Sequence, residues 1–350
     1  MDNICTEETA LLLLHWYDRS KRELPWRIDH DPYRVWVSEI MLQQTRVEAV
    51  IFYYERFLRR FPDVFALANA PEEDVVKAWE GLGYYNRVRN MQKAARCIAA
   101  GGGRFPRDAA ELQKLPGFGE YTAGAVASIA FNLPVPAVDG NVLRVLSRLN
   151  CDARDISSTQ TRKSAALQIQ QWIPDGRAGD FNQAIMDLGA TVCLPNGDPR
   201  CEQCPLHGVC LSFARGCQRS LPVKKPRPQR KKEQKTVFVL LYHNLTAIRR
   251  REKMDVLSGM WELPTVPGWL SEQEQRQQLS EWGIQLKNDI LQQLPAAKHI
   301  FTHIEWQMKG VLVQAEAPVE ANGLRWVASE ERLNEIAIPS AFRAYLRFLP

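Results

Sequence analysis

The sequence contains no long uninterrupted hydrophobic run. The longest apolar run near its start, Ala10 to Leu14, ends at His15 and follows Glu7 and Glu8. A membrane helix needs about 20 apolar residues, and a signal peptide begins with basic rather than acidic residues. We therefore expect no membrane span, and a protein that works in the cytoplasm or in an organelle whose targeting segment is missing.

A strong overall charge is also absent, because the 350 residues carry a formal net charge of only +5. With 45% hydrophobic and 24% charged residues, the composition excludes disordered and fibrous proteins and suits a globular chain of about two domains. The positive charge is concentrated between Arg219 and Lys235, where eight Lys and Arg against one Glu give +7 in seventeen residues. Such a segment can follow a nucleic-acid backbone, with binding that weakens in salt, but a solvated linker explains it equally well.

Strand patterns are lacking in the first 215 residues, where apolar residues recur with helical spacing and prolines separate the runs. Residues 216–235 are rich in Pro, Lys and Arg, and β-rich runs with a few helical patterns follow them. We therefore expect a mainly α protein. Its parts would be a helical domain at 1–215, a basic linker at 216–235 and a smaller α+β domain at 236–350.

The elements that the patterns predict can be given by their ranges. No internal repeat is evident. The expected helices of the first domain cover 9–19, 32–45, 47–60, 71–80, 88–100, 109–114, 121–131, 141–149, 160–172 and 180–192. In the second domain the expected strands cover 236–243, 245–249, 298–306, 309–315 and 324–327, and the expected helices 271–282, 329–336 and 339–348.

Cysteine is sparse except in one cluster. Five of the eight cysteines fall between Cys193 and Cys217, and a reducing compartment disfavours a disulfide framework. The spacing Cys193-x7-Cys201-x2-Cys204-x5-Cys210 therefore predicts a metal centre. Zinc sites usually pair two short knuckles across a longer loop, whereas a single CxxC in one short segment favours an iron–sulfur cluster. Cys217 stays open as a fourth ligand in an alternative arrangement.

Two carboxylates occupy unusual positions. Glu39 is surrounded by apolar residues nearly all round its predicted helix, which favours its neutral form and suits a general acid. Asp139 follows an apolar run and precedes a predicted helix, so it is either a helix cap or a second functional carboxylate. One acid kept protonated and one kept ionised would suit cleavage of a glycosidic bond.

A glycine-containing hairpin, residues 116–123, separates two predicted helices. Gly117 and Gly119 permit a close approach of the backbone, so amides at the start of the second helix can face a phosphate. A tight turn between two helices explains the same pattern equally well. Glu120 suits phosphate binding only if it points away from the ligand.

These motifs occur in order with Leu24-Pro-Trp-Arg27, Ser38 to Thr45, Gly81 to Tyr85 and Val138-Asp-Gly-Asn141. Over nearly its whole length the chain resembles the mismatch-specific adenine DNA glycosylases. These are helix-hairpin-helix glycosylases related to endonuclease III. The resemblance implies a helix-hairpin-helix domain with an iron–sulfur loop, a Nudix-like C-terminal domain, and duplex DNA with 8-oxoguanine:adenine or guanine:adenine mispairs as the partner. It also implies a monomer in the bacterial cytoplasm, associated with the nucleoid through DNA.

The resemblance further implies roles for individual residues. Glu39 would protonate adenine, Asp139 would stabilise the oxocarbenium ion or form a transient covalent adduct, and Asn141 would orient that site. Gln44 and Tyr84 would enter the base stack, although helix surface and core are their ordinary explanations. The [4Fe–4S] cluster would be held by Cys193, Cys201, Cys204 and Cys210. The expected DNA-binding residues are Gln44, Thr45, Leu82, Tyr84, Gly117, Gly119, Arg200, Phe301, Thr302 and His303.

Tyr121 stands where endonuclease III relatives carry the lysine that forms a Schiff base, so the resemblance implies a monofunctional enzyme that leaves an abasic site. In the C-terminal domain, Arg249 to Lys253 and Gly259 to Pro264 are Nudix-like, but no REUXEE box follows. The loop Phe301-Thr302-His303 matches the family's Phe-Ser-His loop for 8-oxoguanine, with threonine in place of serine. The first cysteine gap has seven residues where six are common.

Three alternatives stay open from the sequence. An endonuclease III-type glycosylase and lyase is disfavoured by Tyr121 and by the additional C-terminal domain. A non-catalytic iron–sulfur DNA-binding protein would leave Glu39 and Asp139 without a role. A Nudix phosphohydrolase is disfavoured by the missing box.

Overall fold

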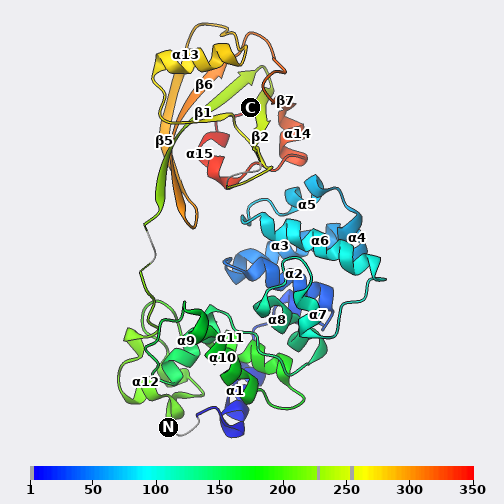
Figure 1. The fold of residues 1–350 in the computed structure, drawn as a ribbon, viewed down its shortest axis with the longest axis vertical. Helices are drawn as coiled ribbons and strands as arrows, with labels where there is room; N and C mark the ends of the chain where they lie inside the picture. Colours follow the sequence, from blue (N-terminus) through cyan, green and yellow to red (C-terminus); the bar gives the residue numbers. More distant parts are fainter. Residues whose placement is uncertain (1–3, 227–228, 253–255) are drawn as a thin grey trace. The chain divides into compact units, whose positions relative to one another are not determined.

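A computed structural model describes residues 4–226, 229–252 and 256–350 (Figure 1). Residues 227 and 228 of the expected linker and Lys253 of the Nudix-like motif lie outside the described residues. The chain divides into two compact units. The first contains Met1–Asn69 and Asn90–Pro226, and the second contains Ala70–Arg89 and Arg227–Pro350.

The first unit is built from helices, as the sequence predicts. α6 begins in the second unit and continues into the first. None of the helices in the described ranges is long and apolar enough to span a membrane. The helices are α1 (Glu7–Ser20), α2 (Pro32–Leu42), α3 (Val47–Arg60), α4 (Val64–Asn69), α6 (Asn86–Ala100), α7 (Ala109–Gln113), α8 (Glu120–Phe131), α9 (Gly140–Leu149), α10 (Thr159–Trp172), α11 (Ala178–Thr191) and α12 (Leu211–Ala214).

Helix α2 occupies the middle of this unit. The Asp31 side chain accepts from the Arg34 amide and Pro32 takes the first helical position, which together set where the helix begins. Because α3 and α8 both pack against it, every residue from Val35 to Met41 is buried. Trp36 stacks on Phe118 with ring centroids 5.1 Å apart. The packing fixes this helix firmly around its one buried carboxyl.

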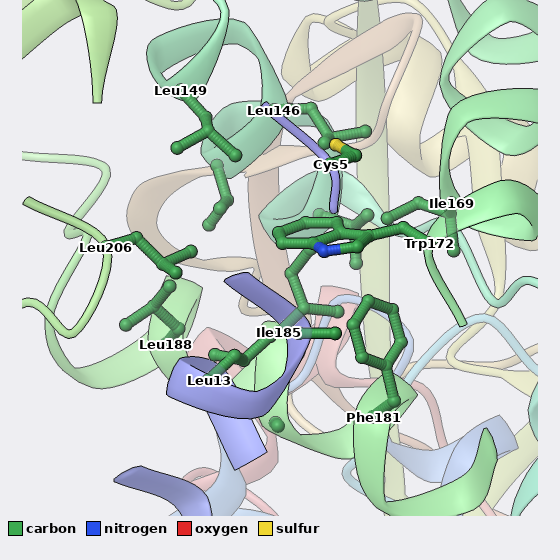
Figure 2. Packing of buried hydrophobic residues seen from close by; sticks show 14 of the residues in the cluster. Cys5, Leu13, Leu146, Leu149, Ile169, Trp172, Phe181, Ile185, Leu188 and Leu206 are labelled. Atoms are coloured by element: carbon green, nitrogen blue, oxygen red, sulfur yellow. The ribbon is translucent and has the colours of Figure 1, made fainter. Parts of the chain in front are cut away.

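A separate core lies among α1, α9, α10 and α11 (Figure 2). Its centre is Trp172, whose indole N–H lies 3.0 Å from both the Thr6 carbonyl and Thr9 Oγ1. Leu206, from the cysteine-rich loop, packs into the same core. The loop is thus anchored on the helices by apolar burial as well as by its cysteines.

The second unit contains a mixed sheet with the strand order β3-β2-β1-β6-β5. β1 and β6 are parallel, and β4 and β7 add to β1 and β2. The strands are β1 (Lys231–Tyr242), β2 (Leu245–Arg250), β3 (Trp261–Glu262), β4 (Thr265–Pro267), β5 (Gln292–Ile300), β6 (Ile304–Gln314) and β7 (Leu324–Ala328). The helices are α5 (Glu72–Ala78), α13 (Glu272–Glu281), α14 (Ser329–Asn334) and α15 (Arg343–Leu346).

Strand β1 shows why both faces of the sheet are covered. Val237 and Val239 point to one face, where they join a core with Phe342 and Tyr345. Phe238 and Leu240 point to the other face, where α13 covers them. Side chains alternate along a strand, so a continuous apolar run predicts a strand buried on both sides. The expected α+β class is confirmed for this part of the chain.

The strands differ from the sequence expectation in several places. β3 and β4 were not expected, β5 begins at Gln292 rather than at residue 298, and the strand expected at 309–315 is part of the longer β6. A single strand over 298–306 was wrong, because residues 301–303 form the turn between β5 and β6. The apolar and aromatic pattern continues through that turn and hides it. β1 begins at Lys231, within the segment expected as linker, because the backbone from Lys231 onward pairs with β6. Its first residues are exposed and charged, so the sequence shows no strand pattern there.

Candidate active site

A cavity of about 590 Å³ opens in the first unit between α2, α8, α9 and α11. It is large enough for a small ligand such as a nucleobase. Eight of the residues singled out from the sequence line it, although they come from distant parts of the chain. They are Glu39, Gln44, Thr45, Gly117, Gly119, Tyr121, Asp139 and Asn141.

Glu39 is the buried acid of this cavity, with only 6% of its surface exposed. Its pKa is raised to about 7. Burial is the main cause and the nearby Asp139 adds to the shift, while a hydrogen bond from Tyr121 and the charge of Arg27 oppose it. A carboxyl with this pKa holds its proton through a large part of the neutral range. It can therefore donate that proton to a bound ligand.

Tyr121 lies at the start of α8 and faces Glu39. Its hydroxyl donates a hydrogen bond to Glu39 Oε2 over 2.5 Å, and the sulfur of Met186 lies 3.8 Å from the same hydroxyl. Burial and the neighbouring carboxylates raise the pKa of Tyr121 well above its ordinary value. The phenol thus stays protonated and acts as a fixed donor to the acid.

Asp139 acts as a cap and also faces the cavity. Its Oδ1 accepts from the amides of Asn141 and Val142 at the start of α9, both over 2.8 Å. Its Oδ2 accepts from the Asn141 side chain over 2.7 Å. Burial prevails and raises the pKa of Asp139, although these bonds and the charge of Arg144 oppose the shift by favouring its ionised form. The two interpretations left open by the sequence are compatible, since capping orients a carboxylate that also lines the cavity.

Arg144 connects this carboxylate to the cysteine-rich loop. Its guanidinium donates to Asn141 Oδ1 over 2.9 Å, to the Gly189 carbonyl over 2.7 Å and to the Cys193 carbonyl over 2.8 Å. Arg144 is only 6% exposed, so these bonds are sheltered from water. Arg144 was not expected from the sequence, because an arginine inside a helix gives no local sign of long-range partners.

A buried ion-pair group on another wall was also missed. Asp187, from α11, accepts from Arg22 and from both terminal nitrogens of Arg27. Burial alone would raise the pKa of Asp187, but the bonds and charges of the two arginines outweigh it and lower the pKa. An acid in an apolar helix was the signal available for Asp187, the same signal that revealed Glu39. Gln183 and Met186 of the same helix complete this wall.

The glycine hairpin leads from α7 into α8. Gly117 has φ +81°, and a Cβ there would lie 2.9 Å from Asn90 Cβ, so glycine is required for shape as well as backbone angle. Gly119 is the N-cap of α8, lines the cavity and offers no side-chain cap bond to the first amides of this helix. Such amides attract anions, which suits a phosphate.

Gln44 and Tyr84 share an unusual backbone. Both have positive φ, +61° and +48°, although neither is glycine. Such strain in side-chain-bearing residues is often found at ligand contacts. Gln44 and Thr45 lie in the turn between α2 and α3, whereas Tyr84 belongs to the second unit, with 48% of its surface exposed. Leu82, in the same loop, is buried.

The turn Phe301-Thr302-His303 lies in the second unit. Thr302 and His303 are exposed, and Phe301 packs edge-on against Trp306 at 4.9 Å. The Tyr84 hydroxyl lies 3.5 Å from Thr302 Oγ1 within the same unit. Two expected DNA-contacting loops are therefore neighbours here, whereas neither lines the cavity.

Four cysteines of the cysteine-rich loop line one small pocket, namely Cys193, Cys201, Cys204 and Cys210, together with Arg148 and Arg200. In the described part of the chain, no three His, Cys, Asp or Glu side chains lie close enough to bind one metal ion. A single tetrahedral zinc would need the sulfurs within about 4 Å of one another. Four thiols gathered around one pocket are the donors that an iron–sulfur cluster takes from a protein.

The carboxylates of α13 are engaged within their own neighbourhood. Glu274 accepts from Ser271 as part of a capping box, Glu272 pairs with Arg276, and Glu281 accepts from Gln277 and Gln278. The buried Glu262 is paired with Arg249 and Arg251. This pattern does not resemble a set of free carboxylates that hold Mg²⁺.

Comparison with known proteins gives a consistent picture. The HhH-GPD superfamily of base excision DNA repair proteins matches residues 37–173, and the NUDIX domain matches residues 236–348. The adenine DNA glycosylase of Mus musculus is 38% identical over 396 residues, which cover 95% of this chain and 77% of the relative.

Two solved structures share the fold of the helical part of the chain. One is a thermostable thymine-DNA glycosylase, with a TM-score of 0.52 and 28% identity over 59% of this chain and 95% of that one. The other is a non-covalent endonuclease III–DNA complex, with a TM-score of 0.51 and 24% identity over 60% of this chain and 98% of that one. At that identity the second likeness supports the fold alone.

Proposed function

The chain belongs to the adenine DNA glycosylases, and from this premise we propose that it removes adenine mispaired with 8-oxoguanine or guanine in duplex DNA. The observation that carries the proposal is the cavity in which a buried acid, Glu39, and a second carboxylate, Asp139, meet. A base must leave the duplex to enter such a cavity. Unstacking costs about a few kcal/mol and is cheapest at a mispair, which adds selectivity.

The chemistry follows from the two carboxyls. Glu39 protonates the adenine ring, so the electrons of the breaking N-glycosidic bond pass to a neutral leaving base. Asp139 stabilises the positive charge that develops on the sugar, either as an ion pair or through a transient covalent adduct. Asn141 holds Asp139 in place through its side-chain amide. Water then completes the hydrolysis and leaves an abasic site.

The enzyme is proposed to be monofunctional. A strand-cleaving lyase needs an amine that forms a Schiff base with the sugar, and Tyr121 provides a phenol at the corresponding place. Its hydroxyl is already committed to Glu39. Any strand break would therefore come from later handling of the abasic site.

DNA binding is assigned to several surfaces of the two units. The amides after Gly117 and Gly119 would contact a phosphate, and Arg200 and the basic segment 219–235 would contact the backbone. Gln44, Thr45, Leu82 and Tyr84 would contact the distorted bases around the mispair. The exposed Thr302 and His303 would read 8-oxoguanine, with the threonine hydroxyl as donor.

A [4Fe–4S] cluster is the cofactor that the four loop cysteines fit. When bound, it would cross-link the loop through four Fe–S bonds from Cys193, Cys201, Cys204 and Cys210. The chain's own contribution is Arg148, which donates to Cys193 Sγ over 3.3 Å and to the Leu194 carbonyl over 2.8 Å. We assign the protein to the bacterial cytoplasm, as a monomer on nucleoid DNA.

The test is single-turnover reaction with a duplex that contains 8-oxoguanine opposite adenine, labelled on the adenine strand. The proposal predicts strand cleavage only after alkaline treatment. Cleavage without alkali would instead support an endonuclease III-type lyase. Tight binding without product under either treatment would support a non-catalytic DNA-binding protein.

A further inference from the structure

Two cysteines outside the proposed ligand set lie side by side in the first unit. The Sγ atoms of Cys151 and Cys217 are 3.1 Å apart, although 66 residues separate them in the chain. Both are free thiols, and each is partly exposed. The sequence left Cys217 open as an alternative metal ligand. In the structure its sulfur instead contacts Cys151, which is not part of the cysteine-rich loop.

The backbone holds both residues in place. Cys151 follows the end of α9 in a left-handed conformation, φ +50°, and its amide donates to the Arg148 carbonyl. The amide of Cys217 donates to the Ser212 carbonyl over 2.9 Å. The contact is thus a product of two separately fixed turns. A disulfide has an S–S bond of about 2.0 Å, so the sulfurs need to approach by only about 1 Å.

We propose that Cys151 and Cys217 form a reversible disulfide, made by exchange with a small-molecule disulfide such as oxidised glutathione. One thiol loses its proton and attacks the small disulfide, which releases one small thiolate and forms a mixed disulfide. The other thiol loses its proton and attacks the protein sulfur of that mixed disulfide, which releases the second small thiolate. The two protein thiols are oxidised by two electrons, the small disulfide is reduced, and the two protons pass to the two released thiolates.

The crosslink would close over the cysteine-rich loop. Arg148, near the end of α9, donates to Cys193 Sγ and Leu194 O at the start of the loop and to Leu221 O beyond its end. The Cys210 thiol lies 3.6 Å from the Arg148 carbonyl. A covalent bond from Cys151 to Cys217 would tie the C-terminal end of the loop to α9, which already binds its N-terminal end. This second part, retention of iron, rests on the proposed cluster.

The test uses the full-length purified protein treated with oxidised glutathione, alkylated and digested without reduction, and read by peptide mass mapping. The expected product joins the peptides of Cys151 and Cys217 and disappears after dithiothreitol. Cys151→Ser and Cys217→Ser should each leave the remaining cysteine as a glutathione adduct. Cys97→Ser, which removes an exposed thiol elsewhere, should form the same crosslink as the wild type. Glutathione adducts on both cysteines of the wild type without a crosslink would overturn the proposal.

Iron release into a chelator separately tests the second part of the proposal, the clamp, by which the Cys151–Cys217 crosslink retains iron in the loop. The oxidised wild type should lose iron several-fold more slowly than the reduced protein, and Cys217→Ser should show no such difference. Equal rates in a protein that carries the crosslink would overturn the clamp but not the disulfide. A purified protein without iron would overturn the proposed cluster, while the peptide map would still decide the disulfide.

Discussion

The Tyr121 hydroxyl donates a 2.5 Å hydrogen bond to Glu39 Oε2 and thereby holds a protonated phenol against the buried acid. This bond favours the ionised form of Glu39, whereas burial favours the neutral form and prevails, giving a pKa of about 7. The opposing effects leave the acid near the pH at which a cell works, so that it holds a proton and can also release it.

Tyr121→Phe should move the pH profile of the reaction in a defined direction. Loss of the hydrogen bond removes an influence that lowers the pKa of Glu39, so the pKa should rise. In the wild type, the single-turnover rate should fall as the pH rises through about 7, because Glu39 loses its proton. In the variant this fall should begin at higher pH. If the fall in rate occurs at the same pH in the variant, or at a lower pH, the hydroxyl does not act on Glu39.

Glu39→Gln should abolish most activity while binding persists. Loss of a general acid typically costs a factor of about 10² to 10⁴ in rate. The measurement is single-turnover adenine excision with duplex affinity determined in parallel. The matched control is Glu48→Gln, an exposed glutamate on α3 that does not line the cavity and should leave the rate unchanged. Retention of the full rate in Glu39→Gln would remove this residue from the chemistry.

The same substitution should change how stability depends on pH. Between its ordinary pKa of 4.5 and the folded value of about 7, Glu39 ionises in the unfolded chain but stays neutral in the fold. The free energy of unfolding therefore falls by about 3 kcal/mol in total as the pH rises through this window, and is constant at higher pH. Glutamine has no such penalty. The urea midpoint of Glu39→Gln relative to wild type should increase from pH 5 to pH 7, and a constant difference would contradict the buried acid.

Arg144→Met should disturb the carboxylate and the cysteine-rich loop together. The change leaves the Asn141, Gly189 and Cys193 acceptors without their common donor, which should cost about 3 kcal/mol in the free energy of unfolding. We expect both a lower excision rate and less bound iron. Arg154→Met is the control, since that arginine forms an exposed pair with Asp152. A normal rate and iron content in Arg144→Met would show that the connection is dispensable.

Local patterns predicted much of the architecture. The boundaries of α3 agree with the sequence analysis, and those of most longer helices agree within a few residues, because apolar periodicity and capping residues act locally. The turn from Phe301 to His303 was not predicted, because no glycine or proline marks it and aromatic and β-branched residues continue through it.

Residues that act over long sequence distances were harder to find. Glu39 was visible because it interrupts an apolar helix, and Asp187 carries the same signal without having been noticed. Arg144 and Arg148 could not be found this way, since Cys193, their partner in the cysteine-rich loop, lies 49 and 45 residues away from them. The contact between Cys151 and Cys217 likewise depends on the fold that brings two turns together.

The most direct test of the account is to measure free adenine released from duplexes that carry adenine opposite 8-oxoguanine, guanine or thymine. From the first two duplexes we expect free adenine in the same amount as alkali-sensitive sites. The thymine duplex should release almost no adenine, and Glu39→Gln should release none. Release of a different base, or equal release of adenine opposite thymine, would contradict it.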